Sequence, residues 1–417
     1  MQHAMTLPRR RTFLAGCLGL ALAPAWASSS SAAAPAKGAL VIAGGALRAD
    51  TAEVWTRIIA LAGGQGARIA VFPSAAGNPQ RAGQTTAAIL RRYGADPFVV
   101  PVAVRLAGTD VRRSADDAAL AEQVRTAGGV FFVGGDQARI TQALLRPDGS
   151  RSAVLDAVWD VYRGGGVVAG TSAGAAVMSS TMFNDAPDLL AVLRDGLPEG
   201  RALAPGLGFI GDKVFIDQHF LVRGRFARML PAMRQRGYQL GLGIDENTAL
   251  VVSGDVVEVL GYKGALLVDL SQATGGQLPG PFRIQNAVLS YLDRGDRYNL
   301  ATGAYVPGAD RSVTLDMDDD LPGPPYSNDI LANNAIVELM ERLVRNPATE
   351  ALGIASGDPR QRATSRERLG FAFTLKKTPH TRAYESAGSG GLSIVGVRLD
   401  VEPVQVGSLQ PQTTGKT

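Results

Sequence analysis

The stretch VVAGTSAGAAVMSS, residues 167–180, joins two patterns that belong to different secondary structures. Its first residues form a short apolar, β-branched run typical of a buried strand, and its later residues are small and favour a helix. Ser172 stands where one pattern changes to the other, and Gly170 to Gly174 fits G-x-S-x-G. That pattern is typical of a sharp strand-to-helix turn that exposes a serine hydroxyl. The stretch predicts an α/β fold with a candidate nucleophile at Ser172, or else a tight turn with a capping serine.

Short apolar runs alternate with helical patterns through the first half of the chain. Segments such as 152–166 carry apolar residues at helical spacing and end in glycines. The apolar runs lie at 39–45, 67–74, 97–102, 129–135 and 166–172. Buried strands separated by helices predict a mostly parallel sheet that is covered on both faces. Sites in such sheets lie at the carboxyl ends of the strands.

The pattern changes to paired strands after about residue 240. Residues 249–252 and 256–260 flank Ser253-Gly254-Asp255, a predicted hairpin turn. Beyond residue 305 we expect a helix over Asp329–Arg345 and two strands near Gly370–Leu375 and Leu392–Val401. We therefore predict a catalytic α/β domain over residues 38–305 and a C-terminal α+β extension over 306–417, packed on that domain.

The first 27 residues are typical of an export signal. Arginines at 9–11 precede the apolar run FLAGCLGLALAP, and Ala25-Trp26-Ala27 offers a small-x-small cleavage site. The arginine pair followed by an apolar run resembles a twin-arginine signal, and a plain secretory signal is the alternative. We expect residues 1–27 to be removed, residues 28–37 to form a linker, and the mature chain to be exported to the periplasm or the medium.

Composition excludes several classes of protein. The chain has 417 residues, 46% of them hydrophobic, which is enough to bury a large core. Its net charge of +4 is spread without a lysine-rich block, so we expect no nucleic-acid partner. No other run reaches the roughly 18 apolar residues of a membrane span, so we expect none in the mature chain. The acidic cluster at 316–320 lacks the spacing of a calcium loop and predicts a solvated turn.

The single cysteine, Cys17, lies in the expected signal. The mature chain therefore has no disulfide, no cysteine nucleophile and no thiolate metal site.

A nucleophilic serine needs a base, and the base needs a group that orients it. Beyond the signal, His219 and His380 are the only histidines, so His219 is the candidate base. Glu246 directly follows an alternating strand pattern at 240–244 and is the candidate orienting acid. An order of serine, histidine and acid differs from that of the α/β-hydrolases. The alternative interpretation of His219 is a buried structural histidine.

Two further groups of residues predict binding sites. Gly134 and Gly135 end an apolar run, and an amide of Gly135 or Asp136 would complete an oxyanion hole with that of Ala173; the glycine pair alone is equally consistent with a tight turn. Arginines bind carboxylates in a bidentate way, so a close group of them predicts a carboxylate-bearing substrate, or else a solvated helix face. This group, with two polar residues before it, comprises Asp217, Gln218, Arg223, Arg225 and Arg228.

Four motifs in order resemble the extracellular cyanophycinases, in a serine-peptidase family that also contains aspartyl dipeptidases. They are GGDQ at 134–137, GTSAGA at 170–175, DQHF-x-x-RGR-x-x-R at 217–228 and GIDENTAL at 243–250. The resemblance covers roughly residues 38–300. It implies a three-layer α/β sandwich like that of the class I glutamine amidotransferases. In that sandwich Ser172 attacks the substrate, His219 is the base and Glu246 orients it.

The resemblance also implies a substrate. Cyanophycin is a poly-aspartate chain with arginine on each side-chain carboxyl, and the family releases β-Asp-Arg dipeptides from it. The implied substrate-binding residues are Gln137, Asp217, Gln218, Arg223, Arg225 and Arg228, with an acyl-enzyme on Ser172 and no cofactor or metal.

Other functions remain open at this point. An exported aspartyl dipeptidase would keep the serine turn without needing the motif at 217–228. A secreted binding protein without catalysis would be expected to lack one of the three residues Ser172, His219 and Glu246, and all three are present. A glutaminase is disfavoured, because its relatives use cysteine. Enzymes built on such sheets commonly pair, so a homodimer is possible.

Overall fold

A computed structural model describes residues 38–276, 280–312, 323–357, 369–388 and 390–405. The expected signal, the linker and the acidic cluster at 316–320 lie outside the described residues. Within the described part, no helix is both long and apolar enough to cross a membrane.

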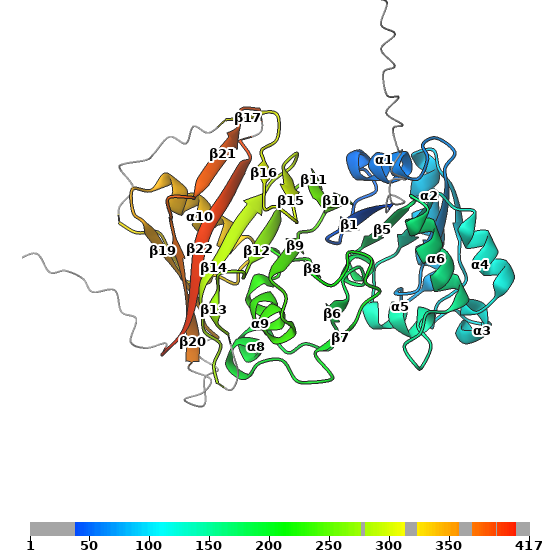
Figure 1. Ribbon diagram of the computed structural model, residues 1–417, viewed down its shortest axis with the longest axis horizontal. Coiled ribbons are helices and arrows are strands. Elements are labelled where there is room, and N and C mark those ends of the chain that lie inside the picture. The colour runs from blue at the N-terminus through cyan, green and yellow to red at the C-terminus, as the bar shows by residue number, and fades with distance from the viewer. Residues whose placement is uncertain (1–37, 277–279, 313–322, 358–368, 389, 406–417) are drawn as a thin grey trace, which may run out of the picture. The chain divides into compact units, whose positions relative to one another are not determined.

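The first of two large sheets contains the predicted parallel strands (Figure 1). Its order in the described chain is β16-β15-β11-β10-β1-β5-β4-β2-β3. The parallel strands match the five apolar runs and comprise β1 (Ala39–Ala43), β5 (Val167–Thr171), β4 (Gly129–Phe132), β2 (Arg68–Phe72) and β3 (Asp96–Val99). The prediction of a mostly parallel α/β sheet is confirmed.

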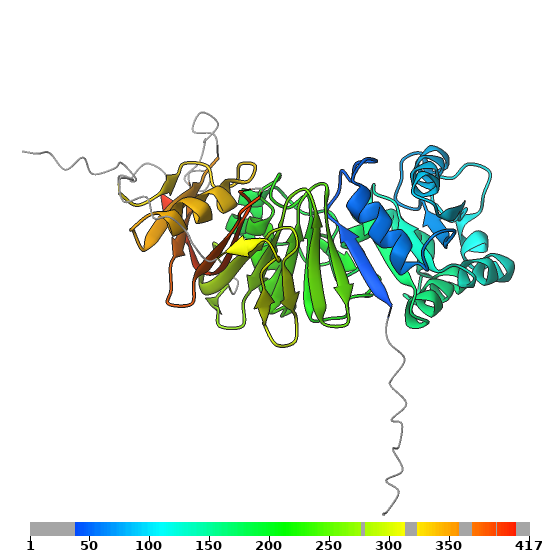
Figure 2. The same cartoon turned by 90° about the horizontal axis from the view of Figure 1, so that it is seen from above.

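Helices cover both faces of this sheet (Figures 1 and 2). Alternate residues of each strand point to opposite faces. Val41 and Val71 pack with α1 (Ala52–Leu61) and α2 (Pro79–Arg92). Their neighbours in sequence, such as Ile42 and Phe72, pack on the other face. The helices of that face include α4 (Ala118–Arg125), α5 (Gln137–Leu144) and α6 (Ala153–Arg163).

Antiparallel strands extend the first sheet beyond β1. The expected hairpin is present as β10 (Thr248–Ser253) and β11 (Val256–Gly261), and β10 pairs with β1. Two short strands, β15 (Arg297–Asn299) and β16 (Tyr305–Val306), complete that edge.

The second sheet joins segments that are far apart in the sequence. Its main path is β18-β19-β20-β22-β14-β12-β9-β8. The central pair is β14 (Ile284–Leu292) with the long β22 (Leu392–Gln405). The remaining strands on the path are β8 (Val214–Gln218), β9 (Leu240–Ile244), β12 (Ala265–Asp269), β18 (Tyr326–Ser327), β19 (Glu350–Ala355) and β20 (Leu369–Lys376). This sheet runs across residue 305, where the sequence predicts a division between domain and extension; the division itself stays a prediction.

Smaller elements complete the described chain. The remaining helices are α3 (Val111–Ala115), α7 (Ala173–Ala176), α8 (Leu189–Asp195), α9 (Phe226–Arg236) and α10 (Ala335–Arg345). The remaining strands are β6 (Thr181–Phe183), β7 (Leu203–Pro205), β13 (Thr274–Gly275), β17 (Arg311–Ser312) and β21 (Arg382–Ser386).

The helix expected over Asp329–Arg345 begins later than predicted. Asn334 has a φ of +63°, a left-handed conformation that an α-helix cannot continue through, and α10 starts at the next residue. The Ile330 amide donates to the Ile354 carbonyl at 2.9 Å, which ties the preceding segment to β19. The prediction is therefore wrong for residues 329–334, because this tertiary hydrogen bond leaves no mark on the apolar spacing.

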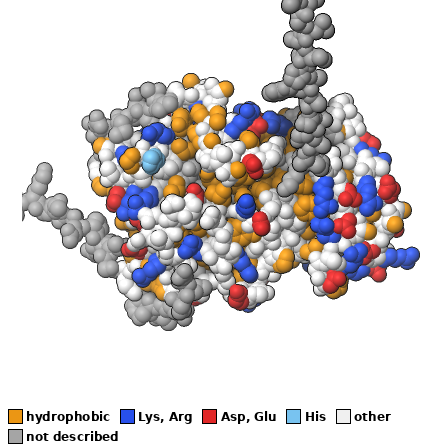
Figure 3. Space-filling view, in the orientation of Figure 1, with side chains coloured by type: hydrophobic (Ala, Val, Ile, Leu, Met, Phe, Trp, Pro, Cys, Tyr) orange, Lys and Arg blue, Asp and Glu red, His pale blue; other side chains and the backbone are white. Residues whose placement is uncertain are grey.

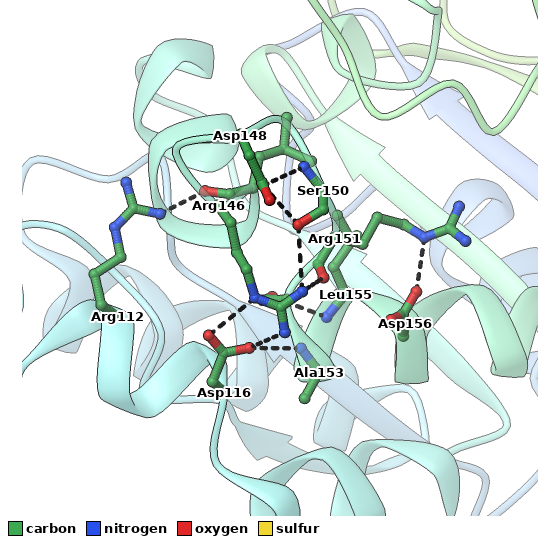
Figure 4. Close-up of polar contacts among 11 residues, drawn as sticks. Arg112, Asp116, Arg146, Asp148, Ser150, Arg151, Ala153, Leu155 and Asp156 are labelled. Atoms are coloured by element: carbon green, nitrogen blue, oxygen red, sulfur yellow. Dashed lines mark hydrogen bonds and ion pairs between the residues drawn. The ribbon is translucent and has the colours of Figure 1, made fainter.

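Ion pairs fix the connection between α5 and α6 (Figure 4). Arg146 contacts both carboxylate oxygens of Asp116, with Nη2 2.6 Å from Oδ1, and the same oxygen accepts the amide of Ala153 at 3.0 Å. Both side chains are about 40% exposed, so such a pair contributes less than about 1 kcal/mol. Figure 3 shows charged side chains of both signs intermingled over this helical part of the face in view.

Candidate active site

The predicted serine turn is present between β5 and α7. Ser172 has φ +54° and ψ −113°, a strained backbone that such turns store. A Cβ on Gly170 would lie 2.4 Å from the Gly174 carbonyl oxygen, and one on Gly174 would lie 2.2 Å from that of Phe132. The two flanking glycines therefore permit a close approach that no larger residue allows. The side chain of Ser172 makes no capping hydrogen bond, which excludes the alternative of a capping serine.

Three predicted residues form one hydrogen-bonded chain. Ser172 Oγ lies 2.8 Å from His219 Nε2, and His219 Nδ1 lies 2.6 Å from Glu246 Oε1. A carboxylate only accepts, so the imidazole proton belongs on Nδ1 and Nε2 accepts from the serine hydroxyl. This is the geometry of a nucleophile, its base and the group that orients the base.

The chain of three residues lies where the two sheets meet. Ser172 follows β5 of the first sheet, His219 follows β8 of the second, and Glu246 lies on the connection from β9 to β10. Backbone hydrogen bonds from Ser172 N to the Ala43 carbonyl and from His219 N to the Gly44 carbonyl, at 3.0 and 2.7 Å, join them to the end of β1. Each residue follows the carboxyl end of a strand, as open α/β sheets predict.

Burial shifts the imidazole of His219 toward its neutral form. Burial of the ring lowers the pKa of His219 below its ordinary value, while the hydrogen bond that the ring donates to Glu246 raises it. The charge of nearby Arg223 lowers this pKa further. A neutral His219 at neutral pH can accept a proton from Ser172.

Two of the predicted oxyanion-hole amides, those of Gly135 and of Ala173 at the start of α7, have no hydrogen-bond acceptor among the described residues. A Cβ on Gly134 would lie 3.2 Å from Ser172 Cβ, which places this loop beside the serine. The Asp136 amide instead donates to the Ala75 carbonyl at 3.0 Å. Because an amide has one hydrogen to donate, the expected oxyanion role is wrong for Asp136 in this conformation.

The residues of the arginine motif fall into two groups by burial. Asp217 is 1% exposed, and Arg228 binds both its oxygens, with Nε at 2.8 Å and Nη2 at 2.7 Å. Arg225 donates to the Gln218 carbonyl at 2.6 Å and lies 3.5 Å from Asp217. Burial lowers the pKa of Arg225 to about 10, so it is still a cation at neutral pH. Arg223 is exposed.

This arrangement corrects the role expected for one residue. The resemblance implies that Asp217 binds the substrate, but its carboxylate faces Arg228, Arg225 and the Gln218 amide, so its partners are groups of the protein itself. Gln218 is buried, and its side-chain Oε1 has no hydrogen-bond partner in the described part of the chain. Gln137 Nε2 donates to the Phe183 carbonyl at 2.6 Å, and the Arg228 guanidinium lies 4.0 Å from the centre of the Phe183 ring. Phe183 therefore brings Gln137 and Arg228 together.

Comparison with known families decides the class of this site. The model of peptidase family S51 matches residues 39–260, which include Ser172, His219 and Glu246. The chain belongs to peptidase family S51. It is accordingly a serine-type peptidase.

Several curated relatives of this S51 peptidase are named cyanophycinase. A cyanophycinase of Geminocystis herdmanii is 34% identical over 274 residues, which are 63% of this chain and 93% of that protein. A cyanophycinase of Trichormus variabilis is 31% identical over 65% of this chain and 88% of that protein. Among solved structures, a peptidase from an acI-B1 Actinobacterium is 24% identical, with a TM-score of 0.46 over 64% of this chain and 98% of that one.

Two positioning residues of this S51 peptidase escape the sequence patterns. Asp245 is fully buried, and its Oδ1 accepts the amides of Leu221 and Val222 at 3.2 and 3.1 Å, just after His219. Its Oδ2 lies 2.8 Å from Lys263 Nζ. Asp245 thus holds the turn that carries His219. Its place beside Glu246 is the only sequence signal for this role.

Gly45 is the second positioning residue. It has a φ of +118°, and a Cβ there would lie 2.3 Å from His219 Cε1. The imidazole therefore packs on the bare backbone of Gly45. The glycine pair at the end of the first apolar run is visible in the sequence, but its contact with the histidine is not.

No group of three or more His, Cys, Asp or Glu side chains in the described ranges is arranged to hold a metal ion.

Proposed function

We propose that this S51 peptidase hydrolyses cyanophycin and releases β-Asp-Arg dipeptides, with Ser172 as nucleophile, His219 as base and Glu246 as the orienting acid. The observation that carries the proposal is the hydrogen-bonded chain of these three residues. The relatives named cyanophycinase, at 31–34% identity over most of their length, support the choice of substrate.

In the proposed mechanism, Ser172 Oγ attacks the carbonyl carbon of the scissile peptide bond while His219 Nε2 takes its proton. The carbonyl oxygen becomes an oxyanion that the free amides of Ala173 and Gly135 stabilise. His219 then gives the proton to the leaving amine, the C–N bond breaks and an acyl-enzyme on Ser172 remains. Water, deprotonated by the same histidine, releases the acyl group.

In this proposal the arginine motif holds the substrate. Each arginyl residue of cyanophycin carries a free carboxylate and a guanidinium. Arg223 is exposed and free to bind a carboxylate, while Asp217 acts through Arg225 and Arg228 by orienting them. Gln218 is buried, with an Oε1 that no described residue pairs, and it stays among the proposed binding residues. Gln137 completes the proposed binding residues.

We also propose that the protein acts outside the cytoplasm after removal of residues 1–27, by the twin-arginine route, because the arginine-rich start and the apolar run that follows favour export. In the same scheme, residues 38–305 are the catalytic domain and 306–417 its extension. A homodimer fits this scheme and is tested by the mass of the protein in solution.

A panel of substrates tests the function. The purified protein is incubated with insoluble cyanophycin and, separately, with α- and β-aspartyl dipeptides, and the products are identified by mass. Release of β-Asp-Arg from the polymer supports the proposal. Cleavage of the dipeptides with the polymer left intact identifies an aspartyl dipeptidase, and no cleavage of any substrate favours a binding protein. Either result refutes the proposed function.

A further inference from the structure

The turn that carries the arginines is also contacted by residues 331–334, far along the chain. Asp245 holds this turn, residues 220–225, from one side. On the other side, the Asn334 amide donates to the Leu221 carbonyl at 3.2 Å. Gly224, between two of the arginines, has a φ of +57°, and a Cβ there would lie 2.4 Å from the Leu331 carbonyl oxygen. The backbone at residue 331 thus contacts the turn directly.

An aromatic contact joins the C-terminal region to the start of α9 as well. Phe226 directly follows Arg225, and its ring packs edge-to-face on that of Phe373, with centroids 5.4 Å apart and planes at 78°. Both rings are buried. Phe373 lies on β20, in the second sheet. Arg225 is therefore flanked on both sides by residues that the C-terminal region fixes in place.

The residues that contact the turn are themselves held by β19 and β20. The buried Ile330 packs on Gly353 of β19, and its amide bonds to Ile354. Strand β19 pairs with β20 along its whole length, so the segment before α10 and Phe373 belong to one unit. The match to the S51 family model ends at residue 260, before this unit begins.

We propose that this unit, residues 330–334 with β19 and β20, is a positioning element for the arginines, which sets how tightly the enzyme holds a carboxylate-bearing substrate. The cyanophycin part of the inference rests on the proposed function. The contacts fall on Leu221, Gly224 and Phe226, whereas His219 is held by Gly44 and Glu246. The unit therefore acts on KM and leaves the acylation of Ser172 unchanged.

Two matched variants of the full chain test the proposal. Phe373→Leu removes the ring that contacts Phe226. Phe371→Leu is the control, because Phe371 is also fully buried and lies two residues away on the same strand, on the same face, without a ring contact to Phe226. Three quantities are measured: hydrogen exchange of the amides of residues 221–228, KM and kcat on short soluble segments of cyanophycin, and hydrolysis of p-nitrophenyl acetate, an ester too small to need the arginines.

We expect Phe373→Leu to speed exchange in residues 221–228 and to raise KM roughly two- to tenfold, the range that an edge-to-face aromatic pair supports. Its kcat and its ester hydrolysis stay at the wild-type level, and Phe371→Leu changes none of these. Equal effects of the two variants, or unchanged exchange in Phe373→Leu, overturn the positioning role. A wild-type protein that leaves cyanophycin intact refutes the proposed substrate, and the exchange comparison then decides the positioning role by itself.

Discussion

Replacing Asp245 with alanine removes the acceptor that fixes the turn after His219. The two amides that bind its Oδ1, those of Leu221 and Val222, lose their partner inside the protein. Lys263 also loses a carboxylate, but its side chain is 31% exposed and can turn to water. Each buried amide left unpaired costs about 1–3 kcal/mol, and the lysine contact adds less than about 1 kcal/mol. We therefore expect the free energy of unfolding to fall by about 2–7 kcal/mol in Asp245→Ala.

The same change acts on catalysis through position. His219 must keep Nε2 within hydrogen-bond reach of Ser172, and a displacement of 1 Å costs about 10²-fold in rate. We expect kcat on cyanophycin to fall by about that factor, and KM to rise as well, because Leu221 and Val222 belong to the turn that carries the arginines. Asp245→Asn is the matched control, because its side-chain carbonyl oxygen can still accept the two amides. It should lose about 1 kcal/mol or less and keep most of kcat.

Urea unfolding gives the stabilities, and initial rates on cyanophycin give kcat and KM. Circular dichroism of each variant shows that the fold is retained. The reasoning is wrong if Asp245→Ala unfolds at the wild-type urea concentration with wild-type kcat. It is also wrong if Asp245→Asn is as damaging as the alanine variant, since that would assign the effect to charge rather than to the two amides.

Three other changes have definite outcomes. Arg223→Gln removes a charge that lowers the pKa of His219, so this pKa rises and the acidic limb of the pH profile of kcat/KM moves to higher pH; an unmoved limb contradicts this. Arg228→Ala leaves the buried carboxylate of Asp217 with the Gln218 amide, at 2.9 Å, and the longer Arg225 contact, so urea unfolding should show a loss of about 3 kcal/mol or more, against no loss if the pair is unimportant. Gly174→Ala would abolish peptidase activity, because its Cβ would lie 2.2 Å from a backbone oxygen behind the serine turn; an active variant would show that the turn can shift.

Local patterns in the sequence predicted the first sheet and the serine turn. Four of the parallel strands, β1, β2, β4 and β5, are buried almost throughout, so each is an apolar run that can be recognised without knowledge of its partners, whereas the edge strand β3 is partly exposed. The flanking glycines predicted the turn at Ser172 for the same reason, since the steric need lies within a few residues. The strand that precedes Glu246, β9, was likewise visible as an alternating pattern at 240–244.

The second sheet and the environment of the arginines depend on distant contacts. Strand β14 pairs with β22, about a hundred residues later, and no pattern within either strand indicates which strand is its partner. The motif at 217–228 indicated a charged binding site, but it did not show that Asp217 is buried and paired with Arg228. Likewise, the amide of Asp136 donates a hydrogen bond to the carbonyl of Ala75, about sixty residues earlier, and only the fold reveals this contact.

The most direct measurement of the central claim compares the wild-type protein with Ser172→Ala on insoluble cyanophycin. The substitution removes the nucleophile without adding bulk, so the variant should fold as the wild type does. We predict that the wild type releases β-Asp-Arg dipeptides, identified by mass, and that the variant releases none. Dipeptide release by the Ser172→Ala variant would contradict the assignment of Ser172 as the nucleophile.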